Sequence, residues 1–188
     1  MTVGLVFPYC DMRWSDGGAP CTEPQVLPKH GRPEPWKRNC TSEGALETAR
    51  RIEAHGRRAF PKKVSVTDRA GLRAWVKELE SSDLAIDILV NNAGIGEVLP
   101  LALMEESDWD QLMNVHVKGA FLTSQAVLRG MIRGRRGNSR NVTSLAGVRM
   151  MKAPVHYCTA KAALSGFTES LAKEIGHYGI TVNAIAPG

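Results

Sequence analysis

The chain has 188 residues, of which 43% are hydrophobic and 23% are charged, a composition typical of one soluble globular domain with its own core. The chain contains no run of about 18 apolar residues that could span a membrane. The first ten residues lack the basic start of a signal peptide, so we expect a cytoplasmic protein. The four cysteines form no C-x-x-C pair and have no histidine at metal-ligand spacing, which leaves no sequence signal for a metal site.

Residues 1–41 differ in composition from the rest of the chain. They contain six of the ten prolines, three of the four cysteines and two of the four tryptophans, with neither a helical period nor a clean alternation. Residues 3–7 allow a short strand that Pro8 would end. We expect residues 1–41 to be an atypical, poorly ordered segment and residues 42–188 to form the folded domain.

Helix and strand signals alternate from residue 42 onward. Residues 43–55 place apolar side chains on one helical face, and Gly56 ends that pattern. The apolar face consists of Ala45, Leu46, Ala49 and Ile52. Residues 62–66 (KKVSV) then predict a short strand.

A helix and a strand are predicted next. Thr67 or Asp68 can cap a helix that runs to about Leu79. The inward face of this helix is expected to consist of Leu72, Trp75, Val76 and Leu79. Residues 87–90 form an apolar strand that runs directly into Asn91-Asn92-Ala93-Gly94.

The second half of the chain continues the alternation. The predicted elements are a helix from near Ser107 to about Ile132, a strand at 139–143, a helix from about Val155 to Gly176, and a strand at 180–185. The apolar stripe of the helix before the last strand consists of Ala160, Leu164, Phe167, Leu171 and Ile175.

The stretch from Arg129 to Arg140 (RGMIRGRRGNSR) carries much of the net charge of +5. A nucleic-acid patch is one interpretation. No aromatic residue is interleaved there for stacking on bases. We therefore favour a solvated loop and expect no nucleic-acid partner.

The alternation as a whole predicts an α/β fold with a parallel sheet and right-handed crossovers. Strands that are buried on both faces should be apolar, and residues 86–90 (IDILV) and 180–185 (ITVNAI) meet that expectation. Residues 139–143 (SRNVT) do not. We therefore expect either that Arg140 pairs with a carboxylate or that this strand is frayed.

Tyr157 and Lys161 lie four residues apart in a predicted helix, so they share one face. An ammonium beside a phenol favours the phenolate and lowers a tyrosine pKa from its usual value of about 10. A tyrosine of this kind donates a proton to a carbonyl oxygen or takes one from an alcohol. The two residues could also be a plain surface pair, because Y-x-x-x-K is common by chance.

Ser144 lies thirteen residues before Tyr157, at the end of the strand predicted at 139–143. Ligands of open α/β sheets bind where the parallel strands have their carboxyl ends. Residues 91–94 end the preceding strand, and residues 186–188 end the following one. We therefore expect three strand ends and the start of the tyrosine helix to converge on one crevice.

Three motifs in this order resemble the short-chain dehydrogenase/reductase family: N-N-A-G at 91–94, a serine followed by Y-x-x-x-K, and V-N-x-I-x-P-G at 182–188. The resemblance covers residues 42–188. It implies a Rossmann-like doubly wound parallel sheet that is incomplete, since the first βαβ unit and the last strand are not recognisable. It also implies a homo-oligomer formed through the helices near 109–132 and 155–176.

The resemblance further implies hydride transfer between NAD or NADP and a ketone or secondary alcohol, a small-molecule substrate. Tyr157 would be the general acid/base, Ser144 would hydrogen-bond the substrate oxygen, and Lys161 would hold the nicotinamide ribose. The cofactor-binding positions would be Asn91, Asn92, Ala93, Gly94, Ser65, Val66, Tyr157, Lys161, Pro187 and Gly188. The two asparagines could instead close the turn after their strand.

The sequence departs from the family in several places. No T-G-x-x-x-G-x-G loop, which would cradle the pyrophosphate, occurs in residues 1–60. The strand that would distinguish NAD from NADP is missing too, and the loss of the first strand should leave a gap in the sheet. Ser65 stands where the family usually has aspartate, and His116 stands in the slot of a catalytic asparagine. His116 could support a proton relay or be a tolerated replacement.

Two other functions stay open from the sequence. The chain could be a catalytically inactive fragment, since residues 1–41 are unlike the rest. It could also act as a dimerisation or interaction module, because the helices that the family uses for pairing are intact. In an active enzyme, Tyr157→Phe should abolish turnover.

Overall fold

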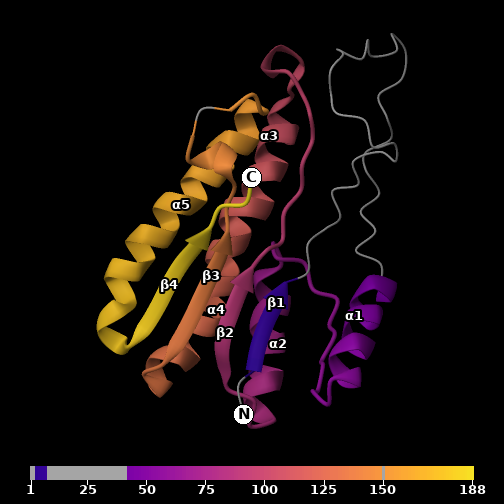
Figure 1. Ribbon diagram of the computed structural model, residues 1–188, viewed down its shortest axis with the longest axis vertical. Coiled ribbons are helices and arrows are strands. Elements are labelled where there is room, and N and C mark those ends of the chain that lie inside the picture. Colours follow the sequence, from indigo (N-terminus) through magenta and orange to yellow (C-terminus); the bar gives the residue numbers. More distant parts are fainter. Residues whose placement is uncertain (1–2, 8–41, 150) are drawn as a thin grey trace.

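The structure, a computed structural model, describes residues 3–7, 42–149 and 151–188, with side chains described from Leu46 onward. The strands (Figure 1) are β1 (Val3–Phe7), β2 (Ile86–Asn91), β3 (Gly137–Val142) and β4 (Ile180–Ile185). The α-helices are α1 (Ser42–Ala54), α2 (Arg69–Ser81), α3 (Glu106–Met113), α4 (Gly119–Gly134) and α5 (Val155–Ile175). Short helical turns lie at Leu101–Leu103, Asn114–Lys118, Leu145–Gly147 and Gly176–Tyr178.

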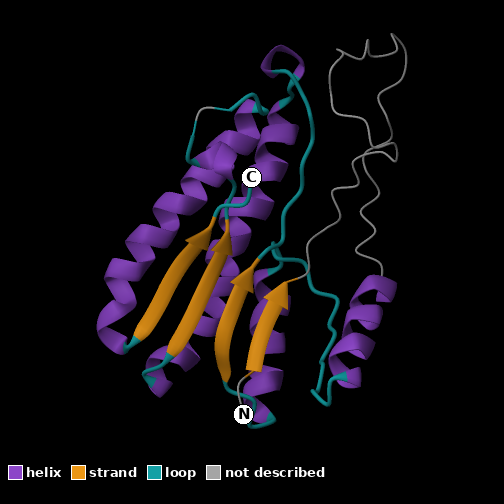
Figure 2. Cartoon of the chain, viewed as in Figure 1, coloured by secondary structure: helices purple, strands orange, loops and turns teal. Residues whose placement is uncertain are grey.

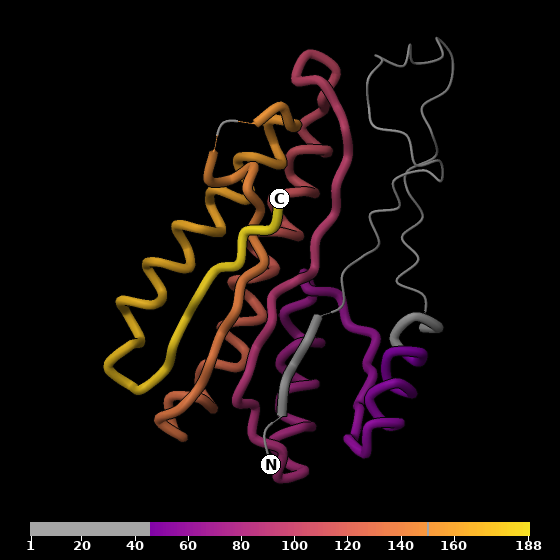
Figure 3. The backbone as a smooth tube through the Cα atoms, in the orientation of Figure 1, coloured from indigo at the N-terminus to yellow at the C-terminus, as the bar shows by residue number. Residues whose placement is uncertain are grey.

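The four strands form one parallel sheet in the order β1-β2-β3-β4 (Figure 2). Helices α2, α4 and α5 pack against one face of the sheet, and no described helix lies in front of the strands in Figure 1. The trace in Figure 3 ends at the edge where β2, β3 and β4 have their carboxyl ends. The predicted fold class, an incomplete Rossmann-like parallel sheet with helices, is confirmed.

The core lies between the sheet and these three helices. Helix α2 contributes the face that the sequence predicted, and its buried side chains are Leu72, Trp75, Val76 and Leu79. Asp68 caps this helix, because its side chain accepts a hydrogen bond from the Gly71 N–H at 3.0 Å. In α5, the predicted stripe is buried at Ala160, Leu164 and Ile175 and half-buried at Phe167 and Leu171.

Two predictions for the first half of the chain are wrong. Residues 62–66 form no strand, and the short strand β1 pairs with β2, so no gap lies beside β2. A strand needs a neighbour for its ladder hydrogen bonds, and no described strand lies beside residues 62–66. Val64 and Val66 instead pack against the core.

Helix α1 forms where the sequence predicted it, but its apolar face is not buried. Leu46 and Ile52 are 46% and 39% exposed, and Ala49 is buried. The side chain of Ala45, predicted for the same face, lies outside those that the structure describes. In Figure 1, α1 stands beside the β1 edge of the sheet and not over the core. The periodicity identified the helix but not what it packs against.

Strand β3 contains polar residues because one face of the sheet carries no described helix, so side chains on that face are exposed. Arg140 is exposed there, and its Nε donates a hydrogen bond to Asn138 Oδ1 at 3.1 Å. Neither form of the expectation for Arg140 holds among the described residues, since Arg140 pairs with no carboxylate there and β3 keeps its register with β4. Ser139 points to the other face and is buried.

The long helix predicted from Ser107 to Ile132 is divided in two. Helices α3 and α4 are joined by a π-helical turn at Asn114–Lys118, which contains His116. Turns of this kind occur frequently at functional sites.

The prediction of poor order for residues 1–41 falls outside the described residues, apart from β1. Among the residues that the structure describes, no helix has the length and apolar character needed to cross a membrane.

Candidate active site

Tyr157 and Lys161 lie one turn apart near the start of α5, as their spacing predicted. The Lys161 Nζ is 5.6 Å from the centroid of the Tyr157 ring and donates a hydrogen bond to the Val142 carbonyl at 2.9 Å. The Lys161 side chain is buried, and this burial lowers its pKa to about 8. Tyr157 is only half-buried, so part of its ring stays accessible to a ligand.

Ser144 stands between the end of β3 and the helical turn Leu145–Gly147. Its Oγ accepts a hydrogen bond from the Ala146 N–H at 3.2 Å. The turn packs tightly on α5, because a Cβ atom added at Gly147 would lie 2.6 Å from the Lys161 backbone carbon. The structure therefore brings the serine to the helix that carries Tyr157, as the sequence predicted.

Pro187 and Gly188 lie against the same turn. The Pro187 carbonyl accepts a hydrogen bond from the Leu145 N–H at 2.9 Å. A Cβ atom added at Gly188 would lie 3.4 Å from the Leu145 side chain. The end of β4 is thus placed next to Ser144, so two strand ends and α5 do converge at one edge of the sheet.

The side chain of Asn91 lies below this edge and is held by protein groups. Its Nδ2 donates to Asn141 Oδ1 at 2.8 Å and to Ser124 Oγ at 3.2 Å. Its Oδ1 accepts a hydrogen bond from the Thr123 hydroxyl at 2.6 Å. Asn141 in turn donates to Thr168 Oγ1 at 2.9 Å. We call these five side chains the asparagine network; it links β2, β3, α4 and α5.

The asparagine network was missed by the sequence reasoning except for Asn91. Its members are buried polar residues, and buried polar groups in proteins are almost always hydrogen-bonded. The one available signal was the presence of polar residues on otherwise apolar helix faces, Thr123 and Ser124 in α4 and Thr168 in α5. The amide of Asn91 is engaged in this network, whereas Asn92 and Ala93 beside it are half-buried.

Gly94 and His116 touch each other at the end of β2. A Cβ atom added at Gly94 would lie 2.7 Å from Cε1 of the His116 ring, so only glycine fits here. The His116 Nε2 is 2.6 Å from the Ile95 carbonyl oxygen and 3.0 Å from the Ile95 nitrogen. One ring nitrogen either donates or accepts, so it can satisfy just one of these two backbone groups.

His116 also contacts the tyrosine. Its ring meets that of Tyr157 edge-on, with 5.9 Å between the centroids. Burial, followed by the positive charge of Lys161, lowers the pKa of His116 from 6.5 to about 4. The imidazole is therefore neutral near pH 7, and its buried Nδ1 has no hydrogen-bond partner among the described residues.

Ser65 and Val66 lie at the approach to α2. Ser65 is exposed, and its hydroxyl is 2.9 Å from the Thr67 hydroxyl. Val66 is closer to the site, since it lines a small cavity of about 10 Å³ together with Asn91, Ala93 and His116. The structure thus groups Val66, but not the Ser65 side chain, with the other predicted site residues.

His156, next to Tyr157, was not predicted. It is buried, its Nδ1 has no hydrogen-bond partner among the described residues, and burial lowers its pKa. Glu97 and Asp108 act in the opposite direction on that pKa. Its position directly before the tyrosine was the only sequence signal for it.

Comparison with known proteins identifies the family. The family described as short chain dehydrogenase matches residues 39–188. The 3-oxoacyl-(acyl-carrier-protein) reductase FabG of Vibrio harveyi is 40% identical over 125 residues, which make up 66% of this chain and 51% of that protein. FabG of Staphylococcus aureus (strain Mu50) is 36% identical over 148 residues, 79% of this chain and 60% of that protein. The chain spans about half the length of the Vibrio relative.

Solved structures agree with this match. A gluconate 5-dehydrogenase from Burkholderia cenocepacia J2315, in complex with NADP and tartrate, gives a TM-score of 0.73 at 37% identity over 78% of this chain and 57% of that one. NAD+-bound xylitol dehydrogenase gives a TM-score of 0.74 at 31% identity over 78% and 56%. The chain belongs to the short chain dehydrogenase family.

Proposed function

We propose that this chain carries the catalytic centre of an NAD(P)-dependent oxidoreductase that interconverts a ketone and a secondary alcohol. The observation that carries the proposal is the placement of Tyr157 and Lys161 on α5, directly against the turn that Ser144 begins. Family membership supports it, as do two similar structures that are described as bound to NADP and to NAD+.

The three side chains have complementary tasks in this reaction. During reduction, the Ser144 hydroxyl would donate a hydrogen bond to the carbonyl oxygen of the substrate. The Tyr157 hydroxyl would give its proton to the same oxygen. The Lys161 ammonium, 5.6 Å from the ring, would stabilise the phenolate that remains. Oxidation of an alcohol would run these proton movements in reverse.

The residues present fit the nicotinamide ribose of such a cofactor, which would supply or accept the hydride. Lys161 has three N–H donors, of which the hydrogen bond to the Val142 carbonyl uses one. The others are free to bind ribose hydroxyls next to Tyr157. Gly94, Pro187 and Gly188 would lie along the same edge.

The test is turnover of NADH or NADPH with a panel of ketones by the chain and by Tyr157→Phe. General acid catalysis contributes about 100- to 10,000-fold, so kcat should fall by that factor. Tyr178→Phe is the matched control, because Tyr178 lies at the far end of α5, against His177. Full turnover by Tyr157→Phe, or none by the unchanged chain, would refute the proposal.

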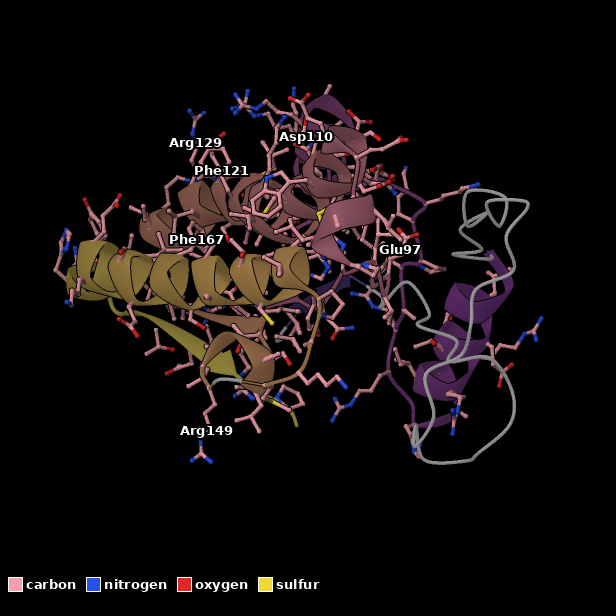
Figure 4. The ribbon with its side chains drawn as sticks, turned by 90° about the horizontal axis from the view of Figure 1, so that it is seen from above. Glu97, Asp110, Phe121, Arg129, Arg149 and Phe167 are labelled. Carbon is pink, nitrogen blue, oxygen red and sulfur yellow. The ribbon has the colours of Figure 1, made fainter. Side chains whose placement is uncertain are left out.

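We also propose that the protein forms a homo-oligomer through α4 and α5. Phe121 on α4 is 39% exposed, and Phe167 on α5 is half-buried (Figure 4).

Light scattering should therefore give a mass above that of the monomer for the chain and a monomer for Phe121→Asp. Val98→Asp is the control, because Val98 is 84% exposed and belongs to the loop after β2, not to α4 or α5. A monomeric unchanged chain would contradict this second proposal.

A further inference from the structure

Helices α2 and α4 enclose a groove of about 240 Å³ away from the candidate active site. We call it the α2–α4 groove. Its apolar lining consists of Val76 and Ala126. Its cationic lining consists of Arg73, Lys77, Arg129 and Arg133, two from each helix and spaced four residues apart, so each pair lies on one helix face.

Two interhelical contacts fix how the helices line up. Near one end, Arg73 Nη2 donates to Gln125 Oε1 at 3.2 Å. Near the other end, Arg133 Nη2 contacts both carboxylate oxygens of Glu80 at 3.1 Å. Gly130 makes the second contact possible, since a Cβ atom there would lie 2.5 Å from Glu80 Oε1.

These two contacts place Lys77 opposite Arg129. Lys77 follows Arg73 by one turn of α2, and Arg129 follows Gln125 by one turn of α4. Both residues line the groove, both are exposed, and neither side chain has a charged or hydrogen-bonding partner among the described residues. Figure 4 shows Arg129 on the side of the helix layer that faces away from the strands.

The groove therefore has an uncompensated positive charge. The only carboxylate among its lining residues is that of Glu80, and Arg133 already engages both of its oxygens. Like charges that face each other disfavour the folded arrangement unless an anion lies between them. A lysine point charge beside an arginine fork is well suited to the oxygens of a phosphate group.

We propose that the α2–α4 groove binds the phosphate group of a small organic phosphate. Lys77 and Arg129 would neutralise the phosphate, which carries up to two negative charges near neutral pH. Arg73 keeps further N–H groups beyond the one bonded to Gln125. The organic part would lie on Val76 and Ala126. This arrangement accounts for the first residues of the basic Arg129–Arg140 stretch, which the proposed oxidoreductase activity does not use.

The other arginines of that stretch are held by local contacts. Arg135 donates to the His177 carbonyl at 3.3 Å, and Arg136 pairs with Asp87 at 2.9 Å. Arg140 is bonded to Asn138 on the opposite face of the sheet. The stretch is thus not one continuous basic surface of the kind that would follow a nucleic-acid backbone.

The experiment is calorimetric titration of the full chain with phenyl phosphate at constant ionic strength. The double variant Lys77→Gln/Arg129→Gln should bind at least about tenfold more weakly, because both charge-assisted contacts are lost. Arg140→Gln, from the same basic stretch, is the matched control and should bind like the unchanged chain. Equal affinity in the double variant and the unchanged chain would overturn the proposal, as would equal binding of phenyl sulfonate, a monoanion, and phenyl phosphate.

A charge reversal gives an independent readout. Lys77→Glu should pair with Arg129, raise the melting temperature and abolish phenyl phosphate binding. A lowered melting temperature together with retained binding would show that Lys77 and Arg129 do not lie opposite each other. Turnover at Tyr157 should not change in these variants, so failure of the groove proposal and failure of the proposed oxidoreductase activity are distinguishable.

Discussion

His116 leaves two polar groups without a partner at the end of β2, its own Nδ1 and one of the two Ile95 backbone groups. Its Nε2 faces both the N–H and the carbonyl of Ile95, and its Nδ1 has no partner among the described residues. An asparagine amide at this position could accept from the one backbone group and donate to the other at once. The imidazole therefore connects the π-helical turn to the Gly94 loop through fewer hydrogen bonds than an asparagine amide would.

We therefore predict that His116→Asn stabilises the fold. A net gain of about 1 kcal/mol in the free energy of unfolding is expected for one additional buried hydrogen bond. Urea denaturation of both proteins measures this gain from the difference in their midpoints, provided that the dependence of the free energy on urea concentration has the same slope in both. Lower stability of His116→Asn would mean that packing of the imidazole against Gly94 and Tyr157 outweighs its unsatisfied nitrogen.

Ser139 offers a second prediction for a single residue. It is buried, and its hydroxyl has no partner among the described residues. Ser139→Ala should leave the free energy of unfolding unchanged or raise it by about 1 kcal/mol, since desolvation of an unpaired hydroxyl is removed. The contrasting variant is Thr123→Val, which removes a hydroxyl bonded to Asn91 and should cost about 1–3 kcal/mol. The same sign of change in both variants would contradict this reasoning.

Among the elements, the turn Leu145–Gly147 most directly determines the geometry of the site. Gly147→Ala would place a methyl group 2.6 Å from the Lys161 backbone and push the turn, with Ser144, away from α5. We expect a loss of about 1–3 kcal/mol in stability, as for other overpacked sites, and a reduced kcat. Gly166→Ala in α5, the helix against which the turn packs, is the control.

Gly166 has no atom within 4 Å of an added Cβ, so alanine there should be neutral or raise helix stability by up to about 1 kcal/mol. Thermal unfolding of both variants checks the pair. Equal stability of Gly147→Ala and the unchanged chain would show that the turn is free to move from α5.

Local patterns predicted most elements, and the failures lie where an element depends on a distant partner. Helix α2 followed its apolar spacing and its Asp68 cap to within two residues. Within the part of the chain that the structure describes, residues 62–66 have a strand-like composition but no neighbouring strand, and α1 has an amphipathic face without a matching core surface. The polar sequence of β3 was read as unfavourable because the sequence could not reveal which face of the sheet lacks a helix.

In the candidate site, too, local features could be predicted from the sequence and contacts between distant residues could not. The four-residue step from Tyr157 to Lys161 is local, so the sequence predicted their shared face. The contact between His116 and Ile95 spans 21 residues, and that between Asn91 and Asn141 spans 50. Side-chain pairs at such separations depend on the register of β2 and β3 and on the packing of α4, which a single sequence does not reveal.

For the whole molecule, the lowered pKa of His116 predicts that stability depends on pH. Its pKa is 6.5 when unperturbed and about 4 in the fold, so between these values the unfolded chain binds the proton more strongly. The stability present above pH 6.5 is therefore lost as the pH falls towards 4. His156, whose pKa is also lowered by burial, acts in the same direction.

Lowering the pH from 7 to 5 should reduce the free energy of unfolding by about 2 kcal/mol through His116 alone. In His116→Asn, this part of the pH dependence should vanish, while that of His156 remains. Urea unfolding at the two pH values measures both proteins. An equally steep fall in the variant would show that other groups cause the loss.

Binding of a nicotinamide dinucleotide tests the central claim most directly, and thermal unfolding with and without NADH or NADPH measures it. A ligand at a hundredfold excess over its Kd stabilises the folded state by about 2.7 kcal/mol, which corresponds to a shift of roughly 5–11 °C for a chain of this size. We predict a cooperative transition that one of the two cofactors raises by this amount. A transition that neither cofactor moves would contradict the assignment of this edge of the sheet to cofactor binding and catalysis.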